Sequence, residues 1–139
     1  MNLNRYLLLV IFGLPISFVD FWSRRIPNQL VALLAIGGLL SYLAEPSAFL
    51  PAVICSILFA VILIPISLLR SGGLGAGDIK LIIVLALILG RGAHILTALM
   101  VASLLGLVHI AAVAIFARRV SRSIAFGPWL IVGALAAIH

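Results

Sequence analysis

Two aspartates, Asp20 and Asp78, are the residues best suited to chemistry in this chain of 139 residues, whose only other acid is Glu45. Two carboxyl groups that meet in a partly desolvated cleft cannot both ionise readily, so the pair tends to share one proton. The ionised member can take a proton from water as the water attacks a peptide carbonyl, and the protonated member can supply the departing amine. Asp20 and Asp78 would therefore offer a metal-free route to peptide hydrolysis if the fold brought them together.

Asp78 follows a glycine-rich segment, with glycines at positions 72, 73, 75 and 77, and it precedes the apolar run Ile79–Leu89. Glycines add little bulk and permit tight turns, so another element can approach the acid closely. Within the apolar run only Lys80 is charged. An ionisable residue at the point where a loop becomes a membrane helix predicts a functional site with a partner. The expected partner is Asp20, which ends the first apolar segment.

Each aspartate also has a simpler structural interpretation. Asp78 can be the N-cap of the following helix, because carboxylate oxygens accept hydrogen bonds from the free N–H groups there. Asp20 can pair with Arg24 at the i, i+4 spacing. However, Asp20 is expected at the C-terminal end of a helix, where the helix dipole disfavours an anion. Capping therefore does not explain Asp20.

The composition predicts an all-α, polytopic membrane protein with a single domain over residues 1–139. Hydrophobic residues make up 65% of the chain, charged residues make up 9%, and the mean hydropathy is +1.42. This excludes an ordinary soluble domain, whereas helices can satisfy every backbone polar group within lipid. The net charge of +6 does not indicate nucleic-acid binding, because the basic residues are scattered between the apolar runs.

The apolar runs predict about six transmembrane spans, and their order must position the two acids. The expected ranges are Leu3–Val19, Leu30–Leu43, Phe49–Leu69, Ile79–Leu89, Ile95–Ala117 and Phe126–Ile138. The first span resembles a signal peptide but has no small-x-small cleavage site, so we expect it to be retained. The fourth span would cover only ~16 Å of a hydrocarbon core of roughly 30 Å. We therefore expect its Asp78 end to stop below the membrane surface.

The distribution of basic residues predicts the orientation in the membrane. One set of loops carries Arg24, Arg25, Arg70, Lys80, Arg118, Arg119 and Arg122. The opposite side carries only Arg5 and Arg91. The larger set is expected in the cytoplasm, which places both aspartates at the cytoplasmic face of the plasma (inner) membrane and both termini outside. Glu45 falls on the opposite side and is interpreted as a solvated turn residue.

Metal and serine chemistry have less support in the sequence. The three histidines, at positions 94, 109 and 139, share no short ligand spacing, and Cys55 is the only cysteine, so we expect no metal and no other cofactor. There is no Gly-x-Ser-x-Gly sequence, and serines in apolar helices commonly bond back to the helix. A serine–lysine dyad using Lys80 stays open, although a helix would direct Lys80 almost opposite to Asp78.

Three short segments in a fixed order carry a family resemblance. They are Asp20 followed by Ile26-Pro27-Asn28, then Gly75-Ala76-Gly77-Asp78-Ile79-Lys80, and finally Phe126-Gly127-Pro128. The middle segment looks like the Gly-x-Gly-Asp motif of the type IV prepilin peptidases, which are membrane aspartic proteases, and the other two resemble that family's first-aspartate segment and the segment before its last span. The resemblance implies that Asp20 and Asp78 are the catalytic pair. It further implies a motif and a cleft formed by Gly75, Gly77, Lys80, Pro27, Asn28, Phe126, Gly127 and Pro128.

The same resemblance implies a substrate and a subclass. The substrate would be a type IV prepilin or pseudopilin, cut at the cytoplasmic face between its short basic leader and its hydrophobic helix. Larger members of the family add a cytoplasmic region with a cysteine cluster and a methyltransferase activity. Because Cys55 is alone, the chain is similar to the short, peptidase-only form associated with tight-adherence pili.

Two functions of other classes stay open at this stage. A small ion- or proton-coupled transporter or channel subunit could use the same buried aspartates to bind protons or cations. A non-catalytic assembly subunit of a secretion machine is the other. Ion flux that is lost on Asp→Asn change would identify the transporter, and assembly that survives such changes would identify the subunit.

Overall fold

The computed structural model describes residues 3–69, 75–117 and 125–138, and within these ranges the chain is helical with no strand. Arg70, Arg118, Arg119 and Arg122, which contribute to the predicted orientation, and the glycines at positions 72 and 73 lie outside the described residues. The helices are α1 (Leu3–Ser23), α2 (Asn28–Leu40), α3 (Phe49–Leu69), α4 (Ala76–Leu89), α5 (Gly92–Ala117) and α6 (Gly127–Ala136), with two short 3₁₀ helices, η1 (Ser41–Ala44) and η2 (Pro46–Ala48).

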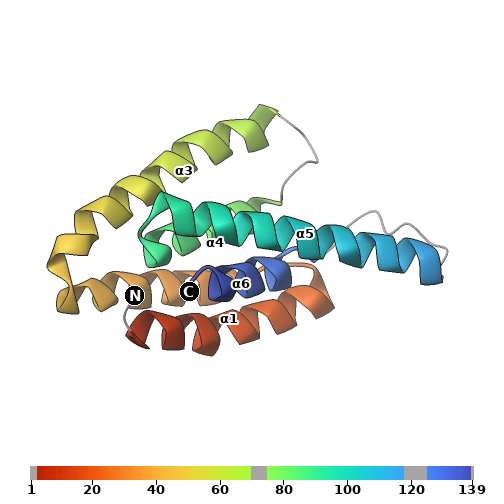
Figure 1. Cartoon of the computed structure of the whole chain (residues 1–139), viewed down its shortest axis with the longest axis horizontal. Coiled ribbons are helices and arrows are strands. Elements are labelled where there is room, and N and C mark those ends of the chain that lie inside the picture. The colour runs from red at the N-terminus through yellow and green to blue at the C-terminus, as the bar shows by residue number, and fades with distance from the viewer. Residues whose placement is uncertain (1–2, 70–74, 118–124, 139) are drawn as a thin grey trace.

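Successive helices run in opposite directions, as Figure 1 shows. Gly13 and Asp20 of α1 lie beside Ile131 and Gly127 of α6 respectively, so these two helices are antiparallel. By contrast, α2 and α4 are parallel, since Lys80 contacts Asn28 at their starts and Ile88 approaches Gly38 near their ends. This alternation gathers the end of α1 and the beginnings of α2, α4 and α6 at one end of the bundle.

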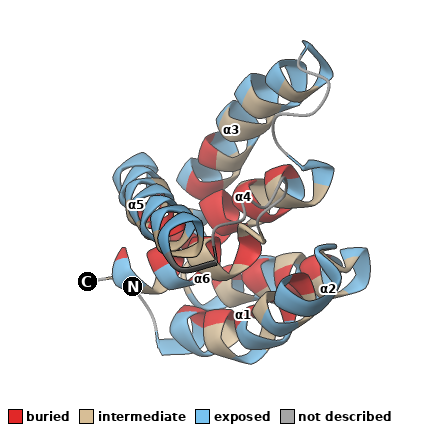
Figure 2. Ribbon diagram, turned by 90° about the vertical axis from the view of Figure 1, so that its right-hand side faces the viewer, coloured by how far each residue is buried: buried red, intermediate tan, exposed pale blue. Residues whose placement is uncertain are grey.

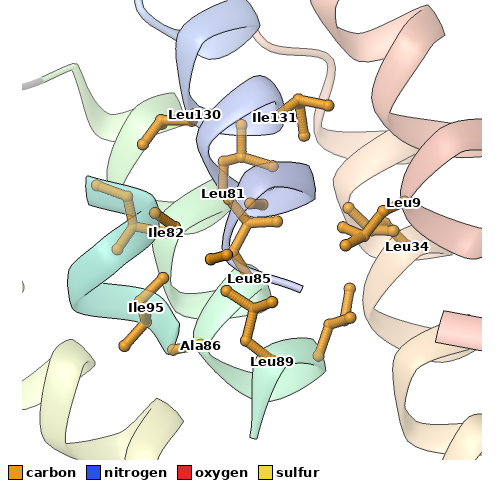
Figure 3. Close-up of a cluster of buried hydrophobic side chains, with 14 of the residues drawn as sticks. Leu9, Leu34, Leu81, Ile82, Leu85, Ala86, Leu89, Ile95, Leu130 and Ile131 are labelled. Carbon is orange, nitrogen blue, oxygen red and sulfur yellow. The ribbon is translucent and has the colours of Figure 1, made fainter. Parts of the chain in front are cut away.

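Helix α4 is the centre of the bundle. Eight of its 14 residues are buried, on all sides of the helix, as expected for an apolar helix without a polar face. Leu81 and Leu85 pack among side chains from α1, α2, α5 and α6, including Leu9 and Leu130 (Figure 3). The site residues at the start of α4 therefore stand on the most rigidly packed element.

Helices α3 and α5 are much more exposed than α4 (Figure 2). In α3 only Ala52 and Cys55 are buried, although the helix is almost wholly apolar. Within the described ranges, three helical segments are long and apolar enough to cross a bilayer: Leu3–Ser23, Pro46–Leu69 and Gly92–Ile115. Their exposed apolar side chains suit contact with lipid. The prediction of a polytopic all-α membrane protein is confirmed in its fold class, with these three helices at full membrane length.

The observed boundaries differ from the predicted spans mainly at the site. Helix α1 continues through Asp20 to Ser23, and α4 begins at Ala76, so that Asp78 is inside the helix and not before it. With 14 residues, α4 is ~21 Å long and remains shorter than a hydrocarbon core of roughly 30 Å. It ends at Leu89, and the next residue is Gly90, whose left-handed φ of 68° glycine adopts without a steric penalty.

The opposite end of the bundle holds an ion pair between a buried arginine and a partly exposed glutamate. The Arg5 guanidinium lies 3.1 Å from a Glu45 carboxylate oxygen and 3.9 Å from the centre of the Tyr42 ring. The Tyr42 hydroxyl in turn donates a hydrogen bond of 2.6 Å to the Leu87 carbonyl of α4. Glu45 lies in the turn between η1 and η2 and is partly solvated, as predicted, but its carboxylate also neutralises an arginine that is almost completely buried.

Candidate active site

Asp20 lies in the last turn of α1 and is only 4% exposed. Its Oδ2 atom accepts a hydrogen bond of 2.9 Å from the backbone N–H of Gly127, the first residue of α6. The N-terminus of a helix presents free N–H groups and a partial positive charge, so it stabilises a carboxylate. The unfavourable position of Asp20 at the end of α1 is thus offset by the beginning of α6, a compensation that the local sequence does not indicate.

Asp78 is the third residue of α4 and is half-buried. The N-cap position belongs to Gly75, so the interpretation of Asp78 as the N-cap is wrong. The Asp78 carboxyl instead accepts a hydrogen bond from the Gly75 backbone N–H. This is the reaching-back half of a capping box, in which the third helical residue binds the N-cap N–H.

The two acids are close enough to interact electrostatically. Desolvation by burial, followed by the negative charge of Asp20, raises the pKa of Asp78 from 3.8 to about 6, against the opposing effect of the Gly75 hydrogen bond. Asp78 stands in the first turn of α4, outside the three helices of membrane length. Like charges that lie near each other disfavour each other's ionisation, so Asp78 keeps its proton to a higher pH than an isolated carboxyl does.

The segment Ile26-Pro27-Asn28 packs directly against the start of α4. The Lys80 ammonium donates a hydrogen bond of 3.1 Å to the Asn28 side-chain oxygen. A Cβ atom added at Gly77 would lie 3.0 Å from the Ile26 Cβ, so glycine is what allows this approach. The space beside Gly77 is thus filled by the Ile26 side chain. The sequence did not indicate that Ile26 packs against the start of α4. Pro27 is the N-cap of α2 and lies just before its first turn.

The segment Phe126-Gly127-Pro128 joins α6 to two other helices. Phe126 is the N-cap of α6, and Pro128 occupies its first turn, where the missing N–H of proline has no cost. The Phe126 ring lies against Gly106 of α5, while Gly127 touches Asp20 of α1. The expectation that these three residues form the wall of a cleft stays a prediction.

The side chains considered for other chemistries differ in their contacts, and the buried hydroxyl of Ser17 has no hydrogen-bond partner among the described residues. Lys80 bonds to Asn28, and the hydroxyls of Ser56 and Ser67 donate to backbone carbonyls. His109 packs against Trp129, with ring centroids 5.4 Å apart. Among the described residues, no group of three His, Cys, Asp or Glu side chains has the arrangement of a metal site.

Comparison with known proteins identifies the family. The chain matches the type IV leader peptidase family over residues 7–115, a range that contains Asp20 and Asp78 and ends before Phe126. No curated protein and no solved structure matches the chain. The family assignment and the three helices of membrane length make this protein an integral membrane peptidase. The match covers well over half of the sequence, and the chain accordingly belongs to the type IV leader peptidase family.

Proposed function

We propose that this protein is an aspartic endopeptidase that removes the leader peptide of type IV prepilins or pseudopilins, with Asp20 and Asp78 as its catalytic pair. The observation that carries the proposal is the approach of these two acids from different helices, close enough for the charge of Asp20 to raise the pKa of Asp78. The family assignment supports the reaction class. Each acid accepts a hydrogen bond from a backbone N–H group at the beginning of a helix, Asp20 from α6 and Asp78 from α4. Such bonds suit catalytic groups that must stay fixed in position.

In the proposed mechanism the dyad begins with one proton. The ionised aspartate removes a proton from a water molecule as the water oxygen bonds to the scissile carbonyl carbon, and the protonated aspartate hydrogen-bonds the carbonyl oxygen. As the tetrahedral intermediate collapses, the C–N bond breaks and the leaving nitrogen takes a proton from the dyad. The products are a leader carboxylate and a mature amine, and the proton balance of the pair is restored.

The proposed substrate follows from the family, and the proposed orientation follows from the distribution of charge. A prepilin has a short basic leader followed by an apolar helix, so the helix would lie in the bilayer and the leader at its cytoplasmic surface. The excess of Lys and Arg in the loops that the sequence predicts on the side of the aspartates supports a cytoplasmic site in the plasma membrane. The exposed apolar faces of α3 and α5 are compatible with a substrate that arrives through the lipid.

The test is cleavage of a co-expressed prepilin by the parent chain and by Asp20→Asn and Asp78→Asn. We expect the parent to shorten the substrate at the leader boundary and both variants to lose at least ~10³-fold in rate, since each removes a proton-transfer group. Glu45→Gln is the matched control, because it changes the third acid at the far end and keeps an oxygen that can accept from Arg5. The membrane abundance of all four proteins must be equal.

Two results would contradict the proposal. Full activity in either aspartate variant would exclude the dyad. Absence of cleavage by an abundant parent chain, across prepilins of several classes, together with proton flux in liposomes that either aspartate variant abolishes, would instead identify a transporter.

A further inference from the structure

We propose that Gly127 is a positioning residue of the peptidase, which holds one oxygen of Asp20 so that the other oxygen faces the reaction. The inference rests on the proposed function, because it assigns a supporting residue to that dyad. Gly127 lies 107 residues from Asp20 in sequence and outside the part of the chain that matches the family. Its role follows from the contact between α1 and α6.

The contact has the geometry of an orienting hydrogen bond. The Gly127 N–H reaches Asp20 Oδ2 at 2.9 Å, and both residues are buried. This bond occupies Oδ2 and fixes the rotation of the carboxyl group, which leaves Oδ1 to exchange the proton with water. A donor of this kind also favours the ionised carboxyl, the form needed by a general base. The second acid is held in a similar way by the N–H of Gly75, so each carboxyl has its own backbone anchor.

The absence of a side chain at residue 127 is part of the same arrangement. A Cβ atom at this position would lie 2.7 Å from Asp20 Oδ2, 3.2 Å from Cγ and 3.3 Å from Cβ. All three contacts are with one short side chain that is anchored to α1. Alanine at position 127 must therefore push the Asp20 carboxyl away from its bound position, even if the rest of α6 stays in place.

The first experiment is Gly127→Ala, measured as kcat, KM and membrane abundance with a prepilin substrate. A displacement on the order of 1 Å of a catalytic group reduces the rate about 10²-fold. We expect that loss in kcat, with KM within about twofold of the parent because the substrate contacts are unchanged. A structural role alone would lower abundance and leave the kcat of the folded protein unchanged.

Two glycine variants serve as controls. Gly13→Ala crowds the same α1–α6 interface, because its new Cβ would lie 2.7 Å from the Cγ2 atom of the buried Ile131 side chain, but it does not touch Asp20. Gly92→Ala adds a Cβ where no atom lies within 4 Å. Both should keep the kcat of the parent. If Gly127→Ala also keeps it while remaining folded, the inference is overturned and the dyad is unaffected.

A second measurement removes the N–H alone. Replacing the amide between residues 126 and 127 by an ester keeps glycine without a Cβ and deletes the donor. Among the described residues, the other ionisable groups at this end of the bundle are Asp78 and Lys80 on α4, His109 on α5, and Arg24 and Arg25 after α1, whereas α2 and α6 carry none.

We expect the ester to shift the acid limb of the kcat/KM profile to higher pH and to lower kcat. If Gly127→Ala does not fold, the ester decides, and an unchanged pH profile overturns the inference. If an abundant parent chain cleaves no prepilin, the proposed function is contradicted, and the role of Gly127 is contradicted with it. The outcomes for the Gly127→Ala and ester variants test the role of Gly127 alone.

Discussion

The Lys80 ammonium donates a hydrogen bond of 3.1 Å to the side-chain oxygen of Asn28, and this contact joins α4 to the beginning of α2. The two residues belong to different sequence segments, 52 positions apart. The Lys80–Asn28 hydrogen bond and the packing of Ile26 on Gly77 together fix the first turn of α4, which carries Asp78. Lys80 therefore positions the helix that carries the acid and does not point into the dyad.

The Lys80–Asn28 bond should contribute modestly to activity. We expect Lys80→Met and Asn28→Ala each to reduce kcat/KM severalfold and the double variant to be no worse than either one. Because the pair is exposed, the coupling energy should be ~0.5–1 kcal/mol. A double-mutant cycle on kcat/KM provides the measurement. Strictly additive losses would contradict a direct coupling.

The contact between Gly77 and Ile26 predicts a rescue. Gly77→Ala should reduce cleavage about tenfold or more, since the new Cβ would lie 3.0 Å from Ile26 Cβ and would push the α4 start away. Adding Ile26→Gly removes the Cβ atom itself together with Cγ1 and Cδ1 and should restore part of the rate. The assay is prepilin cleavage with abundance matched, and Gly92→Ala is the control. Failure of the double variant to recover would assign another role to Gly77.

The pH dependence of the free enzyme should reflect the raised pKa of Asp78. Burial and the charge of Asp20 place this pKa at about 6, so above that pH the dyad loses the proton it needs. We expect kcat/KM to fall about tenfold per pH unit above pH ~6. The fall in kcat should begin at a higher pH than the fall in kcat/KM, because bound substrate desolvates the pair further. Asp78→Asn should abolish the activity, so its profile serves as the background.

The same shift has a consequence for stability. A carboxyl with a raised pKa binds its proton more tightly in the native state, so its contribution to stability is full below 3.8 and is lost as the pH rises to about 6. The melting temperature of the parent in detergent should therefore decrease across this window relative to Asp78→Asn. Parallel curves for the two proteins would contradict the raised pKa.

The Arg5–Glu45 pair at the opposite end should matter for stability and not for catalysis. Arg5→Met removes a buried charge together with its hydrogen bonds and its contact with the Tyr42 ring. We expect a loss of about 1–3 kcal/mol, limited because the Glu45 side chain is 42% exposed and can be hydrated. Thermal unfolding in detergent measures the loss, while kcat of the folded fraction should stay within about twofold. A large fall in kcat would indicate coupling between the two ends.

The orientation can be tested with single cysteines in a Cys55→Ala background. Gln29→Cys lies at the aspartate end and Ser47→Cys at the opposite end, and both positions are exposed. A membrane-impermeant maleimide applied to intact cells should label residue 47 and reach residue 29 only after the membrane is opened. The reverse pattern would place the site outside.

The sequence by itself determined the helical class, the approximate helices and the two candidate acids. Apolar runs leave the chain few alternatives in lipid, and Phe49–Leu69 was predicted at its observed bounds for this reason. Asp20 and Asp78 stood out because the chain has only three acids, and the segment around Gly127 was recognised by its resemblance to a family motif. Their spacing along the chain did not say how they meet.

Tertiary structure decided what surrounds each acid. Gly127 binds Asp20 only because antiparallel packing brings the start of α6 to the end of α1, and Arg5 meets Glu45 only because η1 folds back over α1. Such contacts join residues that are 40 to 107 positions apart, and no local pattern encodes them. The chain's composition selects helices, whereas the packing between the helices sets the charge environment in which a carboxyl can act.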